Sequence, residues 1–290
     1  MSTTMRSSAS RSRVTLHGRE LAYIHYPGVG VPLLLVHGVG SSADGWAEVA
    51  EQFASSGRHV ISVDMPGHGD SSREPGDYSL GSLASTLRDL LDHLGIEQAI
   101  FVGHSLGGGV SLQFHYQFPH YVAGLVLVSS GGLGTDASFV LRVATVPGAG
   151  LVMRMGLNRR TLGAVDVVRQ RVRRWGGPED FVSDKLMDRL DELSTSDGRN
   201  SFLWTLRSVV DFSGQRVSAL EKLHLSRSVP VLIIWGEKDH ILPVAHGYTA
   251  HELLPGSQLE IFDEAGHEPH RSDPDRFVRV VEAWQDASDL

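Results

Sequence analysis

The stretch that most constrains the fold is Gly103-His104-Ser105-Leu106-Gly107, a G-x-S-x-G pattern. It lies between an apolar run at residues 99–102, typical of a buried strand, and a helical pattern at residues 110–118. A strand that turns at once into a helix forces a positive φ on the corner residue, which is costly for a side chain with a Cβ atom. Glycines two positions away on either side remove side chains that would collide as strand and helix close together. We therefore predict that the Ser105 hydroxyl stands above a sheet, at the N-terminus of a helix.

Strand and helix patterns alternate along much of the chain. Continuous apolar runs predict strands buried on both faces, and stripes of helical period predict the helices between them. The predicted strands are residues 14–16, 21–24, 31–36, 60–63, 99–102, 122–128, 231–235 and 258–262, and the main predicted helices are residues 46–55, 78–94, 110–118, 245–253 and 274–287. This alternation predicts an α/β fold, in which helices cover both faces of a mostly parallel sheet.

The chain divides into four segments. Residues 1–13 are rich in Ser, Thr and Arg, and we expect them to form a disordered tail. We expect residues 14–134 to form the first part of the α/β core and residues 227–290 to form the second part. Between them, residues 135–226 show helical patterning with Gly and Pro breaks and lack a convincing buried strand, which predicts an inserted helical cap.

The composition of the chain argues against several classes of function. The chain has 290 residues, a net charge of −8 and no cysteine. Its acidic balance argues against non-specific nucleic-acid binding, and the lack of cysteine excludes disulfides, thiolate catalysis and Cys-ligated metals. The sequence contains neither a stretch long enough for a membrane-spanning helix nor the apolar core of a signal peptide. We expect a cytoplasmic protein without an integral membrane segment.

Five motifs follow one another along the chain. They are His37-Gly38, Asp64-x-Pro66-Gly67-His68-Gly69-x-Ser71, the G-x-S-x-G pattern, Gly236-x-x-Asp239 and Gly266-His267. In this order the chain resembles the α/β-hydrolase superfamily, and the match covers nearly everything except the tail and the cap. The resemblance implies an α/β-hydrolase fold with a mostly parallel eight-stranded sheet, flanking helices and an inserted helical cap.

The resemblance also implies a catalytic triad. Ser105 matches the nucleophile, His267 matches the base that accepts and returns a proton, and Asp239 matches the acid that orients the imidazole. Some relatives place the acid after the strand at 122–128, but this chain has Ser129-Ser130 there, which favours Asp239. Asp263 and Glu237 are the alternatives for that role.

Acyl transfer also needs hydrogen-bond donors for the oxyanion. By the family pattern, these are the backbone N–H groups of Val39 and Leu106. The candidate substrate-binding residues are Gly38, Gly40, His104, Met153 and Trp204. The first two glycines would let their loop approach the substrate closely, and the last two side chains belong to the expected cap.

The resemblance favours cleavage of a small-molecule carboxylic ester through an acyl-enzyme. Carbon–carbon bond hydrolases acting on vinylogous diketones are similar around residues 37–40 and 130–134, but usually have Gly-Pro-Gly where this chain has Gly40-Ser41-Ser42. They often have Asn at the position of His104, and Trp at the position of Glu268. A cofactor-free haloperoxidase and a ligand-binding receptor-like relative, which is not an enzyme, are the further alternatives.

The expected cap carries many arginines and little acid. The arginines are Arg142, Arg154, Arg159, Arg160, Arg169, Arg171, Arg173 and Arg174, and the only acid among them is Asp166. One interpretation is a basic lid that contacts an anionic lipid surface, and the other is a solvated helix face whose arginines pair with acids elsewhere. The sequence shows no zinc spacing, phosphate loop or dinucleotide fingerprint, so we expect neither a metal nor a cofactor.

Overall fold

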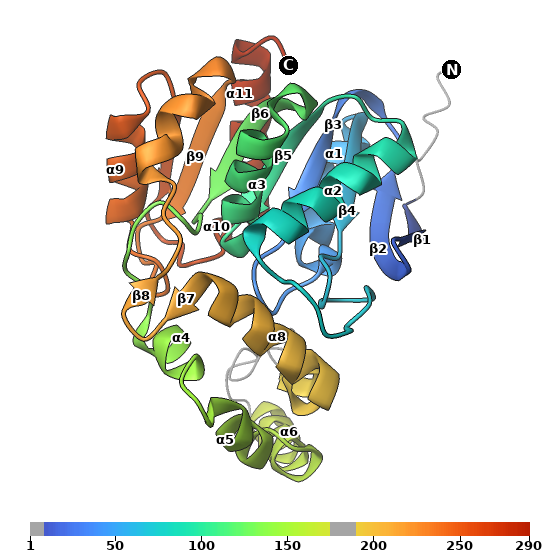
Figure 1. Cartoon of the computed structure of the whole chain (residues 1–290), viewed down its shortest axis with the longest axis vertical. Helices are drawn as coiled ribbons and strands as arrows, with labels where there is room; N and C mark the ends of the chain where they lie inside the picture. The colour runs from blue at the N-terminus through green and yellow to red at the C-terminus, as the bar shows by residue number, and fades with distance from the viewer. Residues whose placement is uncertain (1–8, 175–189) are drawn as a thin grey trace.

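The computed structural model describes residues 9–174 and 190–290, except for the side chains at 159, 168–170 and 172–174. Its centre is an eight-stranded sheet in the order β1-β2-β4-β3-β5-β6-β9-β10 (Figure 1). The strands are β1 (Ser10–Leu16), β2 (Arg19–Tyr26), β3 (Val29–Val36), β4 (Arg58–Val63), β5 (Ala99–His104), β6 (Val122–Val128), β9 (Val231–Gly236) and β10 (Gln258–Phe262). The mostly parallel eight-stranded sheet that we expected is confirmed.

The first strand corrects one of our predictions. β1 begins at Ser10 and pairs antiparallel with β2, so residues 10–13 are strand, and their assignment to a disordered tail is wrong. The alternating Ser and Arg residues of this segment have no apolar periodicity. Its backbone pairs with β2 instead, and long-range ion pairs from Arg11 to Asp44 and Asp70 add to this pairing. The remainder of the predicted tail, at residues 1–8, lies outside the described residues.

The parallel strands are buried because helices cover both faces of the sheet. Leu34 and Val36 of β3 pack into the cluster that contains α2, α3 and α9 residues. Leu33 and Leu35 of the same strand face the opposite cluster, which contains α1 and α11 residues. These helices and the short ones beside them are η1 (Ala43–Trp46), α1 (Ala47–Ser55), α2 (Leu80–Leu94), α3 (Leu106–Gln117), η2 (Pro119–Tyr121), α9 (Ala245–Leu253), α10 (Pro269–Ser272) and α11 (Pro274–Ala287).

The chain between β6 and β9 places the described elements from α4 to β8 toward one end of the molecule (Figure 1), whereas its last element, η3, contacts α3 and α9 of the core. Its described elements are α4 (Phe139–Ala144), α5 (Ala149–Gly156), α6 (Arg159–Arg174), α8 (Ser196–Val209), β7 (Val210–Asp211), β8 (Gly214–Gln215) and η3 (Leu220–Ser228). We call the elements from α4 to β8 the cap. The small antiparallel β7–β8 sheet was absent from our predictions, because two-residue strands leave no periodic signal.

Within the part of the chain that the structure describes, no helix has both the length and the apolar character needed to cross a bilayer.

Candidate active site

The candidate nucleophile sits at a strained corner between β5 and α3. Ser105 has φ 54° and ψ −116°, a conformation that residues with a Cβ atom rarely adopt. Its N–H donates to the carbonyl of Val128 at 2.9 Å, and its own carbonyl accepts from Gly108 at 3.0 Å and from Gly131 at 2.8 Å. These bonds to the neighbouring strand and loop stabilise the strained corner.

Glycines permit this corner, as the sequence pattern indicates. A Cβ atom on Gly107 would lie 2.1 Å from the carbonyl oxygen of Val36, and one on Gly103 would lie 2.4 Å from the carbonyl oxygen of Gly107. Both contacts involve backbone atoms, which cannot rotate away as a flexible side chain can. The close approach of α3 to β3 and β5 therefore requires glycine at both positions.

His267 and Asp239 form a hydrogen-bonded pair. The Nδ1 atom of His267 lies 2.8 Å from Oδ2 of Asp239, and because a carboxylate only accepts, Nδ1 is the donor. Oδ1 of Asp239 accepts from the N–H groups of Ile241 at 2.8 Å and Leu242 at 2.9 Å. Burial by itself raises the pKa of Asp239, but the hydrogen bond and charge of His267 and the two amides outweigh it and hold the pKa below its usual value. The carboxylate is therefore ionised at neutral pH.

The loops after β9 and β10 bring this pair together. A Cβ atom on Gly236 would lie 2.0 Å from the carbonyl oxygen of Gly266, so the two loops are in direct backbone contact. The alternatives for the acid, Glu237 and Asp263, are exposed, whereas the side chain of Asp239 is fully buried. Of these three carboxylates, Asp239 is the one bonded to His267.

His104 supports the backbone of His267. Its Nε2 donates to the carbonyl of His267 at 2.8 Å, across 163 positions of sequence. Burial, helped by neighbouring His267 and His270, places the pKa of His104 well below its usual value, so the ring is neutral. Among the described residues, no hydrogen bond joins the Ser105 hydroxyl to His267. Such bonds are often long without substrate and tighten in the reactive complex.

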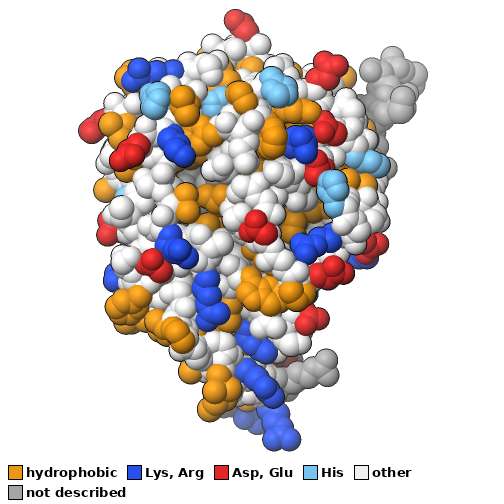
Figure 2. All heavy atoms as spheres, viewed as in Figure 1, with side chains coloured by type: hydrophobic (Ala, Val, Ile, Leu, Met, Phe, Trp, Pro, Cys, Tyr) orange, Lys and Arg blue, Asp and Glu red, His pale blue; other side chains and the backbone are white. Residues whose placement is uncertain are grey.

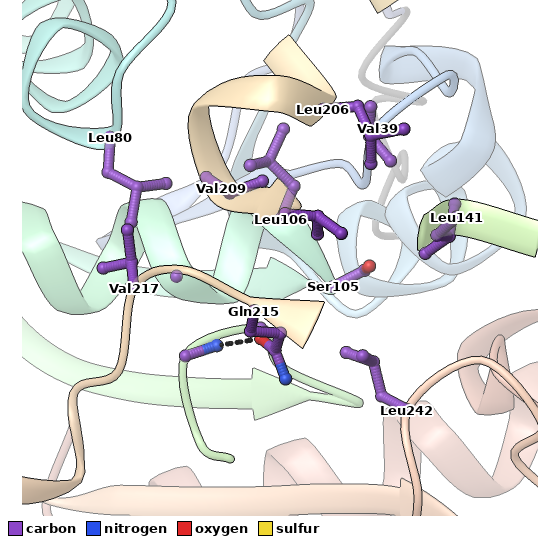
Figure 3. Close-up of a pocket in the computed structure, with 14 residues that line it drawn as sticks. Val39, Leu80, Ser105, Leu106, Leu141, Leu206, Val209, Gln215, Val217 and Leu242 are labelled. Atoms are coloured by element: carbon purple, nitrogen blue, oxygen red, sulfur yellow. Dashed lines mark hydrogen bonds between the residues drawn. The ribbon is translucent and has the colours of Figure 1, made fainter. Parts of the chain in front are cut away.

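A narrow apolar cavity opens beside Ser105, whose hydroxyl projects into it (Figure 3). Its volume is about 50 Å³. Core and cap both contribute to its lining, which is Val39, Leu80, Ser105, Leu106, Gly109, Gly131, Gly132, Leu141, Leu206, Val209, Val210, Gln215, Val217 and Leu242. The Gln215 side chain accepts from the Gly132 N–H at 2.7 Å and donates to the Asp136 carbonyl at 3.0 Å, so its polar atoms are engaged by backbone.

None of the predicted substrate-binding residues lines this cavity. Gly38 packs against His104 and Ser105, because a Cβ atom there would lie 2.9 Å from Nδ1 of His104. Gly40 faces a ring of the cap, and Trp204 stacks on Tyr78 with ring centroids 5.7 Å apart. Met153 lies on α5, away from the lining.

Sequence reasoning missed most of the cavity wall. Leu206, Val209 and Leu141 come from cap helices, and the periodicity of α8 could have identified Leu206 as a buried position but not as a wall of the site. Which helix face meets the cavity depends on how the cap docks on the core.

Val39 and Leu106, whose N–H groups are the two predicted oxyanion donors, line the cavity together with Ser105. In the described parts of the chain, neither group donates to a protein acceptor. Leu106 is the first residue of α3, so its N–H has no acceptor within the helix.

His37 orients the other donor, the N–H of Val39. Nδ1 of His37 donates to the Gly38 carbonyl at 2.7 Å, and its Nε2 accepts from the Met65 N–H at 3.0 Å. In a planar trans peptide, fixing the Gly38 carbonyl also fixes the opposed N–H of Val39.

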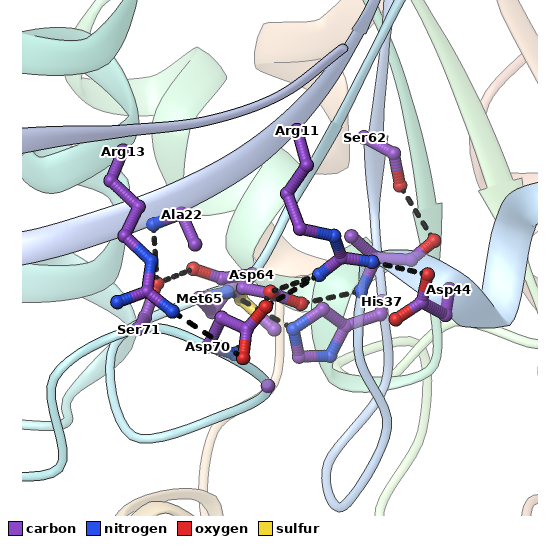
Figure 4. A network of polar contacts seen from close by, with 12 residues as sticks. Arg11, Arg13, Ala22, His37, Asp44, Ser62, Asp64, Met65, Asp70 and Ser71 are labelled. Carbon is purple, nitrogen blue, oxygen red and sulfur yellow. Dashed lines mark hydrogen bonds and ion pairs between the residues drawn. The ribbon is translucent and has the colours of Figure 1, made fainter. Parts of the chain in front are cut away.

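A buried carboxylate supports the far end of the same loop (Figure 4). Asp64 accepts from the Ala43 N–H at 2.6 Å and from the Asp70 N–H at 3.0 Å, and Arg11 of β1 lies 3.7 Å away. Burial raises the pKa of Asp64 above its usual value, although the two amides and Arg11 oppose the shift. The loop at residues 37–43 is thus held at both ends by neighbouring residues, His37 by Met65 and Ala43 by Asp64.

One group of described side chains has the composition of a metal site. Potential ligand atoms of His104, Glu268 and His270 lie within 4.8 Å of one another. However, Nε2 of His104 already bonds to the His267 carbonyl, and Glu268 pairs with Arg271 at 3.0 Å. We assign no metal to this group.

Several known proteins are similar to this chain over most of its length. The chain is 41% identical over 281 residues to an uncharacterised protein of Mycobacterium tuberculosis, a match that covers 95% of this chain and 81% of the relative. It is 31% identical over 277 residues to a 2-hydroxy-6-oxononadienedioate/2-hydroxy-6-oxononatrienedioate hydrolase of Paraburkholderia phymatum, with 91% of each chain covered. The crystal structure of an esterase from Rhodococcus sp. ECU1013 superposes with a TM-score of 0.69 and 25% identity, covering 97% of this chain and 99% of the esterase.

A family model described as alpha/beta hydrolase fold matches residues 31–274. This span runs from β3 to the start of α11 and includes Ser105, Asp239 and His267. The chain therefore belongs to the α/β-hydrolase family.

Proposed function

We propose that the protein is a serine hydrolase that cleaves a carboxylic ester through an acyl-enzyme intermediate. The observation that carries the proposal is the position of the Ser105 hydroxyl, which projects from a strained corner into an almost entirely apolar cavity. The His267–Asp239 pair, which lies on the loops after two neighbouring strands, supplies a base with a fixed orientation.

In the proposed reaction, Ser105 Oγ attacks the ester carbonyl carbon while His267 takes the hydroxyl proton. Because Nδ1 of His267 donates to Asp239, Nε2 is the nitrogen that accepts this proton. The ionised Asp239 stabilises the resulting imidazolium. His267 then protonates the leaving alcohol, and a water molecule hydrolyses the acyl-enzyme by the same route.

The N–H groups of Val39 and Leu106 would stabilise the negative charge that develops on the carbonyl oxygen. Each such donor is typically worth about 3 kcal/mol of transition-state stabilisation. Both amides are without a protein acceptor in the described parts of the chain, which suits this role, since a donor already satisfied could not bind the oxyanion.

The cavity beside Ser105 favours an unbranched, apolar acyl group. Its volume of about 50 Å³ is well below the range of roughly 300–1,000 Å³ typical of drug-sized ligand pockets. Its walls are aliphatic side chains and glycines, apart from Ser105 and Gln215. A slender hydrocarbon chain would bury its surface there, while a branched or aromatic acid would collide with Leu206 or Val209.

Cleavage of a carbon–carbon bond is the second candidate. The relative from Paraburkholderia is a hydrolase of 2-hydroxy-6-oxononadienedioate, and its sequence aligns with most of this chain. A dioate carries carboxylates, which require a cationic or hydrogen-bonding partner once they leave water. The described residues that line the cavity include neither Lys nor Arg, and this favours the ester.

An ester panel tests the proposal. The purified protein should hydrolyse p-nitrophenyl esters of linear acids faster than those of branched acids of equal carbon number, and Ser105→Ala should abolish turnover while leaving the circular-dichroism spectrum unchanged. A vinylogous diketone serves as the competing substrate. If only the diketone is consumed, the carbon–carbon reaction replaces the ester. Binding without turnover of either substrate would indicate a receptor.

A further inference from the structure

The cap exposes an unusual number of large apolar side chains. On α4 these are Phe139, Val140 and Val143, and on α5 they are Leu151, Val152 and Met155, with exposed fractions between 38% and 74%. Phe212 in the β7–β8 turn is also exposed. We call these seven residues the apolar face. In Figure 2, orange side chains gather at the end of the molecule where α4 and α5 lie.

These residues do not hold the cap to the core. Leu141, on the opposite side of α4, lines the cavity beside Ser105, and Ala149 of α5 is buried. The apolar face is thus the outward side of the two helices whose inward sides contact the rest of the protein. Soluble monomers rarely expose large apolar patches unless these contact a membrane, a partner or a ligand.

Cations accompany the apolar face. The guanidinium of Arg142 lies 5.5 Å from the ring centroid of Phe212, and its Nε donates to the Phe212 carbonyl at 2.6 Å. Arg154 of α5 and Arg160 of α6 are exposed nearby in sequence. Between residues 139 and 167 the chain has four arginines and one acid, although its total charge is −8. The charge of this region is therefore opposite to that of the protein as a whole.

This combination of charge and apolarity decides between possible occupants. A symmetric dimer through this face would bring the same arginines of two copies together, which repels. An anionic bilayer presents phosphate groups above a hydrocarbon interior. Aliphatic and Phe side chains can enter that interior while long Arg side chains reach the phosphates.

We propose that the apolar face docks the protein on anionic lipid bilayers. Docking would place the cap next to the membrane, with Leu141 of the cavity wall on the inner side of the docked α4 helix. Delivery of an apolar ester from the bilayer to Ser105 is a consequence that rests on the proposed ester hydrolysis, whereas docking itself does not.

Sedimentation with vesicles tests the docking. The full-length protein is mixed with vesicles of phosphatidylcholine, with and without phosphatidylglycerol, at low and high salt. We expect binding to the anionic vesicles that weakens with salt. Replacing Val140, Leu151 and Val152 together by Ser should reduce the partition coefficient at least about tenfold, and Arg154→Gln with Arg160→Gln should reduce it about tenfold for anionic vesicles only.

A matched control removes exposed apolar side chains from the α/β part of the protein instead, outside the cap. Val29→Ser with Leu253→Ser changes two exposed positions away from the cap and should bind vesicles like the wild type. All variants should hydrolyse a soluble p-nitrophenyl ester at the wild-type rate without vesicles, so that loss of docking is distinguished from failure of the proposed reaction. Equal vesicle binding by the wild type and the cap triple variant would overturn the proposal. So would a cap-dependent dimer that does not bind lipid.

Discussion

His267 donates its Nδ1 proton to Oδ2 of Asp239 over 2.8 Å, and this bond fixes the tautomer of the imidazole. The carboxylate is anchored from the other side by the amides of Ile241 and Leu242, so it cannot rotate without breaking those bonds. The His267 side chain is 17% exposed, while that of its partner is fully buried. In the proposed reaction the pair would present one nitrogen to the substrate while its compensating charge stays inside the protein.

Asp239→Asn should lower kcat for ester hydrolysis by about 10⁴, since an amide can donate to Nδ1 and so stabilise the wrong tautomer. Steady-state kinetics on a p-nitrophenyl ester measures the effect. Glu237→Gln and Asp263→Asn change the exposed alternative carboxylates and should retain near wild-type kcat. A loss of activity in either of these variants that matches the loss in Asp239→Asn would reject the assignment of the acid.

His37 should influence kcat through the Gly38–Val39 peptide. His37→Gln keeps an acceptor near the position of Nε2 for Met65 but loses the donor to Gly38, so kcat should fall about tenfold to a hundredfold with little change in KM. His37→Asn keeps a donor near Nδ1 and should recover much of kcat, while losing stability because the Met65 N–H is left unpaired. If both variants lose stability and activity in parallel, His37 has only a structural role.

The elbow glycine at 107 should not accept alanine. The added Cβ atom would lie 2.1 Å from a backbone oxygen of β3, and we expect Gly107→Ala to lower the free energy of unfolding by at least about 3 kcal/mol. Gly81→Ala is the control, because the new Cβ atom would make an ordinary contact at 3.5 Å on a helix and should stabilise by up to about 1 kcal/mol. Urea denaturation of both variants measures the difference.

Stability should fall as the pH falls below about 6.5, in part because of His68. Burial, with the neighbouring His37, lowers the pKa of His68 from 6.5 to about 3. Between pH 6.5 and about pH 3, the unfolded chain binds a proton at His68 that the folded chain does not. The contribution of His68 to stability is therefore complete above about pH 6.5 and is lost as the pH falls toward about 3. The slope from one such group is about 1.4 kcal/mol per pH unit.

His68→Gln should therefore flatten the dependence of unfolding free energy on pH between about pH 7.5 and about pH 5. Some slope should remain, because burial also lowers the pKa of His104. Identical slopes for the wild type and the variant would show that His68 does not contribute.

Sequence patterns predicted the sheet well where strands are buried on both faces, as in β3, because such strands carry continuous apolar runs that are easily recognised in the sequence. They failed at residues 10–13, where a polar edge strand pairs with β2 and makes ion pairs to side chains far along the chain. Ser105 could be recognised because the strained corner requires glycines at fixed offsets. Leu206, Val209 and Gln215 could not be recognised as cavity residues, since their role depends on the docking of the cap.

Arg11 of β1 lies 3.7 Å from the buried carboxylate of Asp64, so a chain shortened at its N-terminus loses this contact. Asp64 is buried, holds the start of η1 through the Ala43 amide, and has its nearby cation on the first strand of the sheet. The composition of the first thirteen residues suggests that the chain could be shortened to begin at residue 14. This change removes the cation and leaves a desolvated carboxylate behind the proposed oxyanion loop. The N-terminal edge of the sheet is thus a distant support of the proposed oxyanion loop, and a shortened protein that folds would report on a loosened form of that loop rather than on its native form.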